Sequence, residues 1–190
     1  MLIYIHGFNS SPASFKARAL KQRLEAAGKA SAFLCPALPD RPALAISVLE
    51  GAVRAARGAQ SVVLVGSSLG GYYASYLAEK FSLKAVLVNP AVRPYEGLRA
   101  LLGPQKNLYT GEAYELTPRH LEELRALDVP LPTRMERYYL MVTTGDEVLD
   151  YRVALRKYPG AKQLVVPGSD HGFAEFADHL DSVLDFAASA

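Results

Sequence analysis

Six short apolar runs, most of them followed closely by glycine or proline, constrain the fold of this chain more than any other feature. They are Leu2–Ile5, Ala32–Cys35, Ser61–Val65, Ala85–Val88, Tyr138–Val142 and Gln163–Val166. Several are continuous rather than alternating, which is typical of strands buried on both faces in a parallel sheet covered by helices. Because helical patterns separate the runs, the sequence predicts an α/β protein with right-handed crossovers.

The predicted helices lie between these runs. In the first, Ser11 is a candidate N-cap, Pro12 takes the first helical position and Gly28 ends the helix. Its apolar residues at helical spacing are Phe15, Ala19, Leu20 and Leu24. The second helix, Pro42–Arg57, has a stripe formed by Leu44, Val48, Leu49 and Val53. The remaining candidates are Ser68–Phe81, Asp150–Tyr158 and Phe173–Ala187.

The length of 190 residues fits one domain built from six strand–helix units. Only Pro90–Arg137 exceeds that framework, as an insertion of about 48 residues. We expect it to consist of loops and one amphipathic helix over Leu116–Leu127. An insertion that follows a sheet strand is a natural lid or pocket wall, and a simple surface excursion is the alternative.

Composition excludes several classes of protein. Half of the residues are hydrophobic, 21% are charged and the net charge is +2 without a long basic run, which argues against disorder and nucleic-acid binding. No apolar run approaches the length of a membrane span, and the N-terminus lacks signal-peptide features, so we expect a cytoplasmic protein. The lone Cys35 excludes an internal disulfide and is expected to be a buried structural thiol.

The segment Gly66–Gly71 contains the pattern G-x-S-x-G directly after a predicted buried strand and at the start of a predicted helix. This is the setting of a nucleophile elbow, in which a serine occupies a strained turn between closely packed elements. Side chains two positions before and after the serine would collide, which explains Gly66 and Gly70. The frame therefore selects Ser68 as the nucleophile rather than Ser67.

A serine nucleophile needs a base, and a third group must orient that base. His171 follows the last predicted strand in a glycine-flanked loop, where ligands bind in α/β folds, so it is the predicted base. His120 and His179 lie in predicted helices and are expected to be surface or partly packed residues. For the acid we favour Asp146, which directly follows a strand and a glycine. Its rivals are Asp150, a plausible helix N-cap, Glu147 and Asp170.

The negative charge that develops on the carbonyl oxygen requires two fixed hydrogen-bond donors. One should be the backbone N–H of Leu69, directly after the nucleophile. We assign the other to the backbone N–H of Phe8, in the loop after the first strand. His6 is expected to orient that loop rather than to act as the base, because it precedes the serine in the chain.

Four motifs of this chain resemble those of α/β-hydrolases: Tyr4–Phe8, Gly66–Gly71, Gly145–Tyr151 and Asp170–Phe173. The insertion is similar to the cap of small bacterial YqiA-type esterases in the segments Val88–Tyr95 and Tyr109–Glu112. The resemblance covers almost the whole chain. It implies a serine hydrolase of esters or thioesters with the triad Ser68, Asp146 and His171, and no metal or organic cofactor.

The resemblance also implies a topology. It predicts a three-layer α/β/α sandwich of about six parallel strands. The usual first two strands of the fold are missing, and residues 32–35 form one edge strand beside Leu2–Ile5. The remaining strands then follow in sequence order.

The sequence thus favours a serine esterase or thioesterase that acts through an acyl-enzyme. The alternatives are a non-catalytic binding protein of the same fold and a triad enzyme that cleaves amide or carbon–carbon bonds. Candidate substrate contacts, besides Phe8 and Leu69, are Asn9, Pro90, Val92, Tyr95 and Val148. We expect a small-molecule substrate, and no cluster of Lys or Arg indicates coenzyme A. Tyrosines in the insertion would permit a homodimer but do not indicate one.

Overall fold

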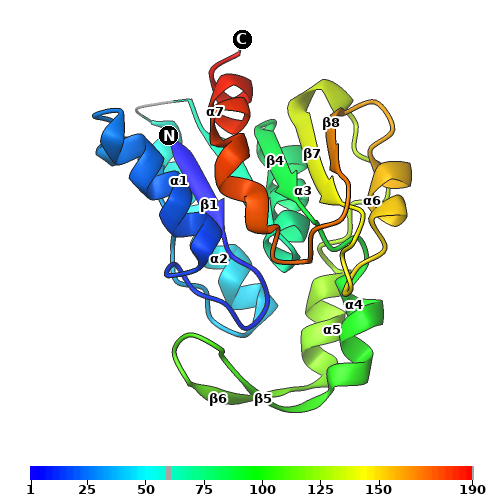
Figure 1. Ribbon diagram of the computed structural model, residues 1–190. Coiled ribbons are helices and arrows are strands. Elements are labelled where there is room, and N and C mark those ends of the chain that lie inside the picture. The colour runs from blue at the N-terminus through cyan, green and yellow to red at the C-terminus, as the bar shows by residue number, and fades with distance from the viewer. Residues whose placement is uncertain (59–60, 190) are drawn as a thin grey trace.

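A six-stranded parallel sheet forms the centre of the computed structural model, which describes residues 1–58 and 61–189 (Figure 1). Its strands are β1 (Leu2–Ile5), β2 (Phe33–Leu34), β3 (Val63–Ser67), β4 (Lys84–Val88), β7 (Tyr138–Thr143) and β8 (Lys162–Val166). They follow the order β2-β1-β3-β4-β7-β8, and every neighbouring pair is parallel. This confirms the predicted sheet, although the edge strand β2 has only two residues.

Helices cover both faces of this sheet, which confirms the predicted three-layer α/β/α architecture (Figure 1). On one face lie α1 (Phe15–Ala26) and α7 (Leu180–Ala188), and on the other α2 (Pro42–Arg57), α3 (Leu69–Phe81) and α6 (Tyr151–Lys157). Short 3₁₀ helices occupy Ala30–Ala32, Leu98–Leu101, Met135–Arg137 and Ala174–His179.

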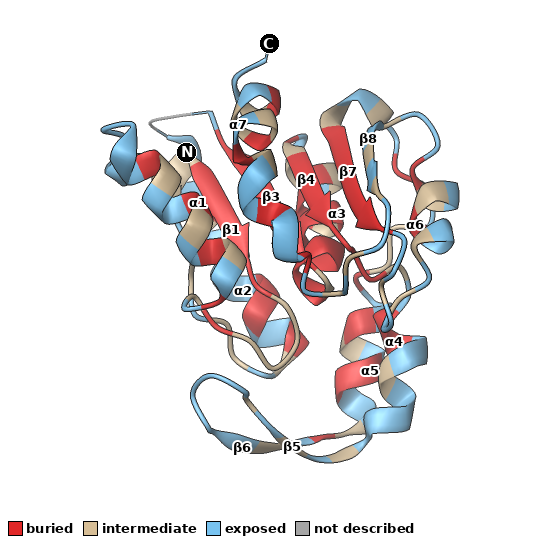
Figure 2. Cartoon of the chain, viewed as in Figure 1, coloured by how far each residue is buried: buried red, intermediate tan, exposed pale blue. Residues whose placement is uncertain are grey.

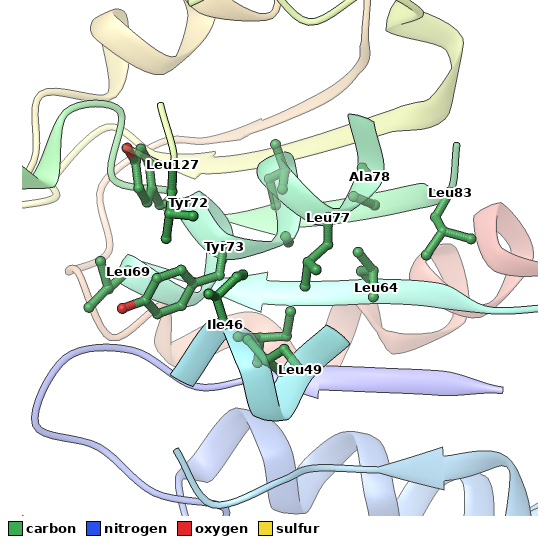
Figure 3. Close-up of a cluster of buried hydrophobic side chains, with 14 of the residues drawn as sticks. Ile46, Leu49, Leu64, Leu69, Tyr72, Tyr73, Leu77, Ala78, Leu83 and Leu127 are labelled. Atoms are coloured by element: carbon green, nitrogen blue, oxygen red, sulfur yellow. The ribbon is translucent and has the colours of Figure 1, made fainter. Parts of the chain in front are cut away.

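Two hydrophobic cores result from the alternation of side chains along the strands. Ile3 and Ile5 of β1 pack toward α2 and α3, whereas Leu2 and Tyr4 pack toward α1 and α7. The central strands are buried on both faces, as Figure 2 shows. Figure 3 shows the first core, in which Leu64 lies among side chains of α2 and α3. Continuous apolar runs therefore arise because both faces of these strands are covered.

Some predicted helical details are wrong. Helix α1 begins at Phe15 rather than near Ser11, because the Ser11 carbonyl and hydroxyl accept the amides of Ser14 and Ala13 in a preceding turn. Phe15 is 46% exposed, because the buried face of α1 is formed by Ala17, Leu20 and Leu24. In α2, Leu44 and Val48 are exposed, because the buried face is formed by Pro42, Ala45, Ile46, Leu49 and Val53. The predicted C-terminal helix divides into the 3₁₀ helix Ala174–His179 and α7.

The insertion between β4 and β7 contains a β-hairpin that the sequence analysis did not predict. The hairpin consists of β5 (Gly103–Lys106) and β6 (Ala113–Leu116). Two helices flank it, α4 (Pro94–Gly97) before it and α5 (Pro118–Arg125) after it. The amphipathic helix predicted over Leu116–Leu127 is present as α5, but it is shorter at both ends. Leu116 belongs to β6, and Thr117 is extended because Pro118 disfavours helical backbone in the residue before it.

Helix α5 is anchored to the body of the protein by buried leucines and polar contacts. Glu123 accepts hydrogen bonds from the Arg41 guanidinium, with Nε at 3.2 Å, and from the Ala43 amide at 3.1 Å. The hydroxyl of Tyr72 in α3 donates to the Leu124 carbonyl at 2.7 Å. The helical half of the insertion is thereby attached to the loop before α2, to α2 itself and to α3.

Three further observations bear on the composition-based expectations. Cys35 is half-buried rather than buried, because β2 is a short edge strand. Among residues 1–58 and 61–189, no helix is both long and apolar enough to cross a bilayer. Within the same residues, His, Cys, Asp and Glu side chains form no group of three or more that could hold a metal ion.

Candidate active site

Ser68 lies in a strained turn between β3 and α3, with φ 55° and ψ −120°. Such backbone angles are rare for a residue with a side chain and are typical of functional turns. A Cβ atom on Gly66 would lie 2.3 Å from the Gly70 carbonyl oxygen, and one on Gly70 would lie 2.0 Å from that of Ile5. The two glycines thus allow α3 to approach β3 and β1 closely enough to present Ser68.

The side chains of Ser68, His171 and Asp146 form one hydrogen-bonded chain. Ser68 Oγ lies 3.0 Å from His171 Nε2, and His171 Nδ1 lies 2.8 Å from Asp146 Oδ2. They come from the ends of β3, β7 and β8, which lie along one edge of the sheet. The structure therefore brings together the three residues predicted as nucleophile, base and acid, with the imidazole between hydroxyl and carboxylate.

The side chain of Asp146 is more enclosed than that of His171, with 2% exposed against 21%. Its Oδ1 accepts the amides of Val148 and Leu149 at 2.9 and 2.8 Å, which fixes the carboxylate. Burial alone would raise the pKa of Asp146, but the hydrogen bond from His171 and those two amides together hold it below the ordinary value. Asp146 is thus set to stay ionised beside the imidazole.

The rival acids have other partners. Glu147 Oε2 accepts the backbone amide of His171 at 3.0 Å, so it supports the base through its backbone. That contact holds the pKa of Glu147 below its ordinary value. Asp150 caps α6, with Oδ1 accepting the Arg152 amide at 3.0 Å. Asp170, adjacent to His171, accepts the amide of Phe173 through its backbone carbonyl.

A buried pair of side chains, Asn89 and Thr143, holds the histidine loop and was not predicted. Asn89 Nδ2 lies 3.1 Å from Thr143 Oγ1 and 3.2 Å from the His171 carbonyl, and Thr143 Oγ1 donates to the Asp170 carbonyl at 3.0 Å. The Thr143 amide donates to Asn89 Oδ1 at 2.9 Å. The sequence did contain a signal for this pair, because Asn89 and Thr143 are polar residues that directly follow two of the predicted apolar strand runs.

The two predicted oxyanion donors flank Ser68. Leu69 is the first residue of α3, where backbone N–H groups lack an acceptor within the helix. Phe8 follows Gly7, which lies so close to Ser68 that a Cβ atom added to Gly7 would be 3.2 Å from Ser68 Cβ. Among the described residues, neither the Phe8 nor the Leu69 amide has an acceptor. Both amides are thus free to donate to a substrate oxygen.

His6 organises the loop that carries Phe8. Its ring is buried, Nε2 accepts the Leu38 amide at 3.3 Å and Nδ1 faces the Gly7 carbonyl at 3.1 Å. This pairing requires a neutral ring that carries its proton on Nδ1, and burial lowers the pKa of His6 accordingly. His6 contacts backbone on both sides, in agreement with an orienting role.

The other two histidines lie outside this chain of contacts. His120 is buried rather than at the surface, because it completes a capping box with Thr117 at the start of α5. His179 ends the 3₁₀ helix before α7 and packs its ring against Phe173 at 5.7 Å.

Two cavities adjoin the site. The first, of about 260 Å³, is lined by Phe8, Leu69 and Tyr73 and by the acidic residues Asp40 and Glu112. The second, of about 340 Å³, includes Ser68 and His171 in its wall. Among the predicted substrate contacts, Asn9 lines both cavities. Among the described lining residues, neither cavity includes Pro90, Val92, Tyr95 or Val148.

Those four residues have other positions. Tyr95 is buried and its hydroxyl donates to Asp128 at 3.1 Å. Pro90 is buried against Gly71 of α3. Val92 packs against the first core, and Val148 is 61% exposed.

The β5–β6 hairpin supplies the outer wall of both cavities. Its turn docks on the loop after β1, where the Leu108 amide donates to the Asn9 carbonyl at 3.0 Å and Asn107 Nδ2 donates to the Ser10 carbonyl at 2.9 Å. The Asn9 side chain donates to Gln105 and accepts from the Tyr114 hydroxyl. The hairpin is therefore attached to the segment that carries the Phe8 amide.

Comparisons with solved structures show the fold. Est1E from Butyrivibrio proteoclasticus is 15% identical with a TM-score of 0.73, covering 99% of this chain and 88% of that one. Alpha/beta hydrolase domain-containing protein 10 from mouse is 16% identical with a TM-score of 0.72, covering 97% and 87%. A monoacylglycerol lipase from Paleococcus ferrophilus is 12% identical with a TM-score of 0.67, covering 98% and 93%. The chain therefore has the α/β-hydrolase fold.

At the level of sequence, one family model matches residues 1–188, nearly the whole chain. Its description is "Uncharacterised protein family (UPF0227)". The chain belongs to this family, and in this chain the α/β-hydrolase fold carries the hydrogen-bonded Ser68, His171 and Asp146 described above.

Proposed function

We propose that the protein is a serine hydrolase that cleaves carboxylic esters or thioesters through an acyl-enzyme intermediate. One observation carries the proposal: a strained serine lies 3.0 Å from a histidine whose other nitrogen lies 2.8 Å from a buried carboxylate. This arrangement is the one that converts a weak alcohol nucleophile into an effective one. Esterases and lipases among the proteins of the same fold support the reaction class.

Each residue then has a defined role. Ser68 Oγ attacks the substrate carbonyl while His171 Nε2 takes its proton, and Asp146 stabilises the imidazolium that forms. The Phe8 and Leu69 amides bind the negative oxygen of the tetrahedral intermediate. When the intermediate collapses, His171 returns the proton to the departing alcohol or thiol, which leaves an acyl group on Ser68. A water molecule, activated by the same histidine, then releases the acid.

The test combines covalent labelling with turnover. A fluorophosphonate probe should label the native protein and the Ser67→Ala variant, but not Ser68→Ala. Ser67 is the matched control because it is the adjacent serine and lies at the buried end of β3. Hydrolysis of 4-nitrophenyl acetate should fall at least about 10³-fold in both Ser68→Ala and His171→Ala.

The alternatives give different results. Equal labelling of the native protein and Ser68→Ala would remove Ser68 as the nucleophile. Labelling without turnover of any activated ester or thioester would favour a non-catalytic binding protein. A chain-length series of aryl esters beside matched thioesters would then define the acyl group and the preferred bond.

A further inference from the structure

The two cavities beside Ser68 have different positions relative to His171. A leaving group receives its proton from His171, so it must lie within hydrogen-bond reach of that imidazole. Ser68 and His171 line only the second cavity, Leu69 lines only the first, and Phe8 lines both. The second cavity is therefore the place for the leaving group, and the first for the acyl group.

Hydrogen-bond donors converge in the second cavity at the start of α1. Ser14 is the N-cap of this helix of 12 residues, and Ser14, Phe15 and Lys16 all line the cavity. The first N–H groups of a helix lack acceptors within it, and the helix dipole adds positive potential at this end. The Ser14 hydroxyl is buried and has no hydrogen-bond partner within 3.5 Å among the described residues, and the group nearest to it in the cavity wall is the neutral hydroxyl of Tyr4. A cap hydroxyl, unused amides and an ammonium group thus lie together.

The side chain of Lys16 makes a single hydrogen bond within the described part of the chain, from Nζ to the Gly172 carbonyl at 2.5 Å. An ammonium group has three N–H donors, so two are unused. No carboxylate of the described residues lies within 4 Å of Nζ, and Asp146 and Asp170 act on it only from a greater distance. Burial lowers the pKa of Lys16 to about 8, so the group still carries its charge at neutral pH. A partly desolvated cation without an ion pair is costly unless a ligand supplies the anion.

The rim of the second cavity is apolar. Phe15, Leu108 and Tyr109 are 46%, 81% and 51% exposed and line the same cavity. Exposed large apolar side chains gathered at one opening are typical of a ligand-binding surface. In contrast, Asp40 and Glu112 in the first cavity would repel an anion. The distribution of charge thus favours one orientation for an asymmetric, negatively charged substrate.

From this convergence we propose that the N-terminus of α1 is an anion-binding site for the leaving group. Lys16 and Ser14 would bind a carboxylate or phosphate carried by the departing alcohol or thiol, and the apolar rim would contact its body. The inference rests on the proposed hydrolase function, because it names the leaving-group class of the same site.

The test uses matched phenyl acetates that differ in the substituent opposite the scissile ester. One carries a carboxylate, one the neutral methyl ester of that carboxylate, and one a phosphate. In Lys16→Met, kcat/KM for the charged esters should fall about tenfold more than kcat/KM for the neutral ester. Lys16→Arg should restore part of the preference for charge, and 0.5 M NaCl should reduce it in the native protein. Ser14→Ala should act in the same direction with a smaller effect.

Lys21→Met, at an exposed position of the same helix, is the matched control and should leave the preference unchanged. A uniform loss for all three esters in Lys16→Met would overturn the inference, because it would mean that Lys16 only holds the histidine loop through Gly172. Equal turnover of charged and neutral esters by the native protein would also overturn it while leaving the hydrolase function intact. Failure of the native protein to hydrolyse any of them, together with no fluorophosphonate labelling, would instead overturn the proposed function. Preference for the carboxylate over the phosphate, or the reverse, identifies the anion.

Discussion

The triad loops and the β5–β6 hairpin meet at the second cavity, yet they are held in different ways. The triad loops (residues 66–71, 143–150 and 167–172) follow buried strands and are joined by the buried side chains of Asn89 and Thr143. The hairpin (residues 103–116) is largely exposed and is attached through polar contacts to Asn9 and Ser10 (Figure 2). Under the proposed function, the buried core would therefore specify the reaction geometry, whereas an exposed surface element would supply substrate contacts. Changes in the first region should therefore lower kcat, and changes in the second should raise KM.

The largest effect is expected for Asp146→Asn. The asparagine carbonyl can still accept the Val148 and Leu149 amides, so its NH₂ group would face His171 Nδ1 and impose the wrong tautomer. We expect kcat for 4-nitrophenyl acetate to fall by about 10⁴-fold with little change in KM. Asp150→Asn is the control, because asparagine caps helices as well as aspartate does. A loss below about tenfold in Asp146→Asn would remove Asp146 from the triad.

A smaller effect on the same region is expected for Thr143→Val. The valine has the same shape but removes the hydrogen bonds that the Thr143 hydroxyl makes with Asn89 Nδ2 and with the Asp170 carbonyl. Asn89 and the Asp170 carbonyl keep other partners, so each lost hydrogen bond should lower the free energy of unfolding, measured in urea, by about 0.5–1.5 kcal/mol. Loosening of the histidine loop should also lower kcat about 10–100-fold. Thr143→Ser keeps the hydroxyl and should recover both values, whereas equal losses in the two variants would count against this role.

The hairpin side of the comparison is tested by Tyr114→Phe. This change removes the 2.7 Å hydrogen bond from the Tyr114 hydroxyl to Asn9 Oδ1 and keeps the ring. We expect KM to rise about 3–10-fold while kcat stays within about twofold, since one polar contact contributes about 1 kcal/mol. Glu115→Gln, at the adjacent exposed position of β6, is the control. A fall in kcat with unchanged KM would show that the hairpin supports the reaction geometry instead.

The same division explains what the sequence could predict. Buried strands carry continuous apolar runs, so β3, β4 and β7 were recognisable, and parallel strands end at one edge, so Ser68 and His171 could be placed together. Asp146 was separable from Asp150 because the latter directly precedes a helical pattern. These inferences depend on local pattern and chain order alone.

The insertion lacked such signals. The sequence of β5 and β6 has no apolar alternation, because the hairpin is held by polar contacts at its turn rather than by a core. The cationic side chain at the second cavity was also missed, since a search for clustered Lys and Arg overlooks one lysine that the first turn of α1 directs to the site. The predicted substrate contacts Pro90 and Tyr95 are buried residues, which chain position alone did not reveal.

The smallest effect concerns the anchor of the insertion, Glu123→Gln. The Arg41 hydrogen bonds lower the pKa of Glu123 to about 2, against an ordinary value of 4.5. Because the folded-state pKa lies below the unfolded one, this carboxylate stabilises the fold fully above about pH 4.5 and progressively less as pH falls toward 2. The Arg41–Glu123 pair is partly exposed, so we expect it to contribute about 1 kcal/mol to the free energy of unfolding after screening by solvent.

Urea unfolding should show the Glu123→Gln variant less stable than the native protein at pH 7 and nearly equal to it at pH 2, with kcat at pH 7 within about twofold of the native value. Glu122→Gln, at an exposed position of the same helix, should show no such convergence. A stability difference of equal size at both pH values would mean that Glu123 acts through packing rather than charge, and a large loss of kcat would extend the catalytic frame into the insertion.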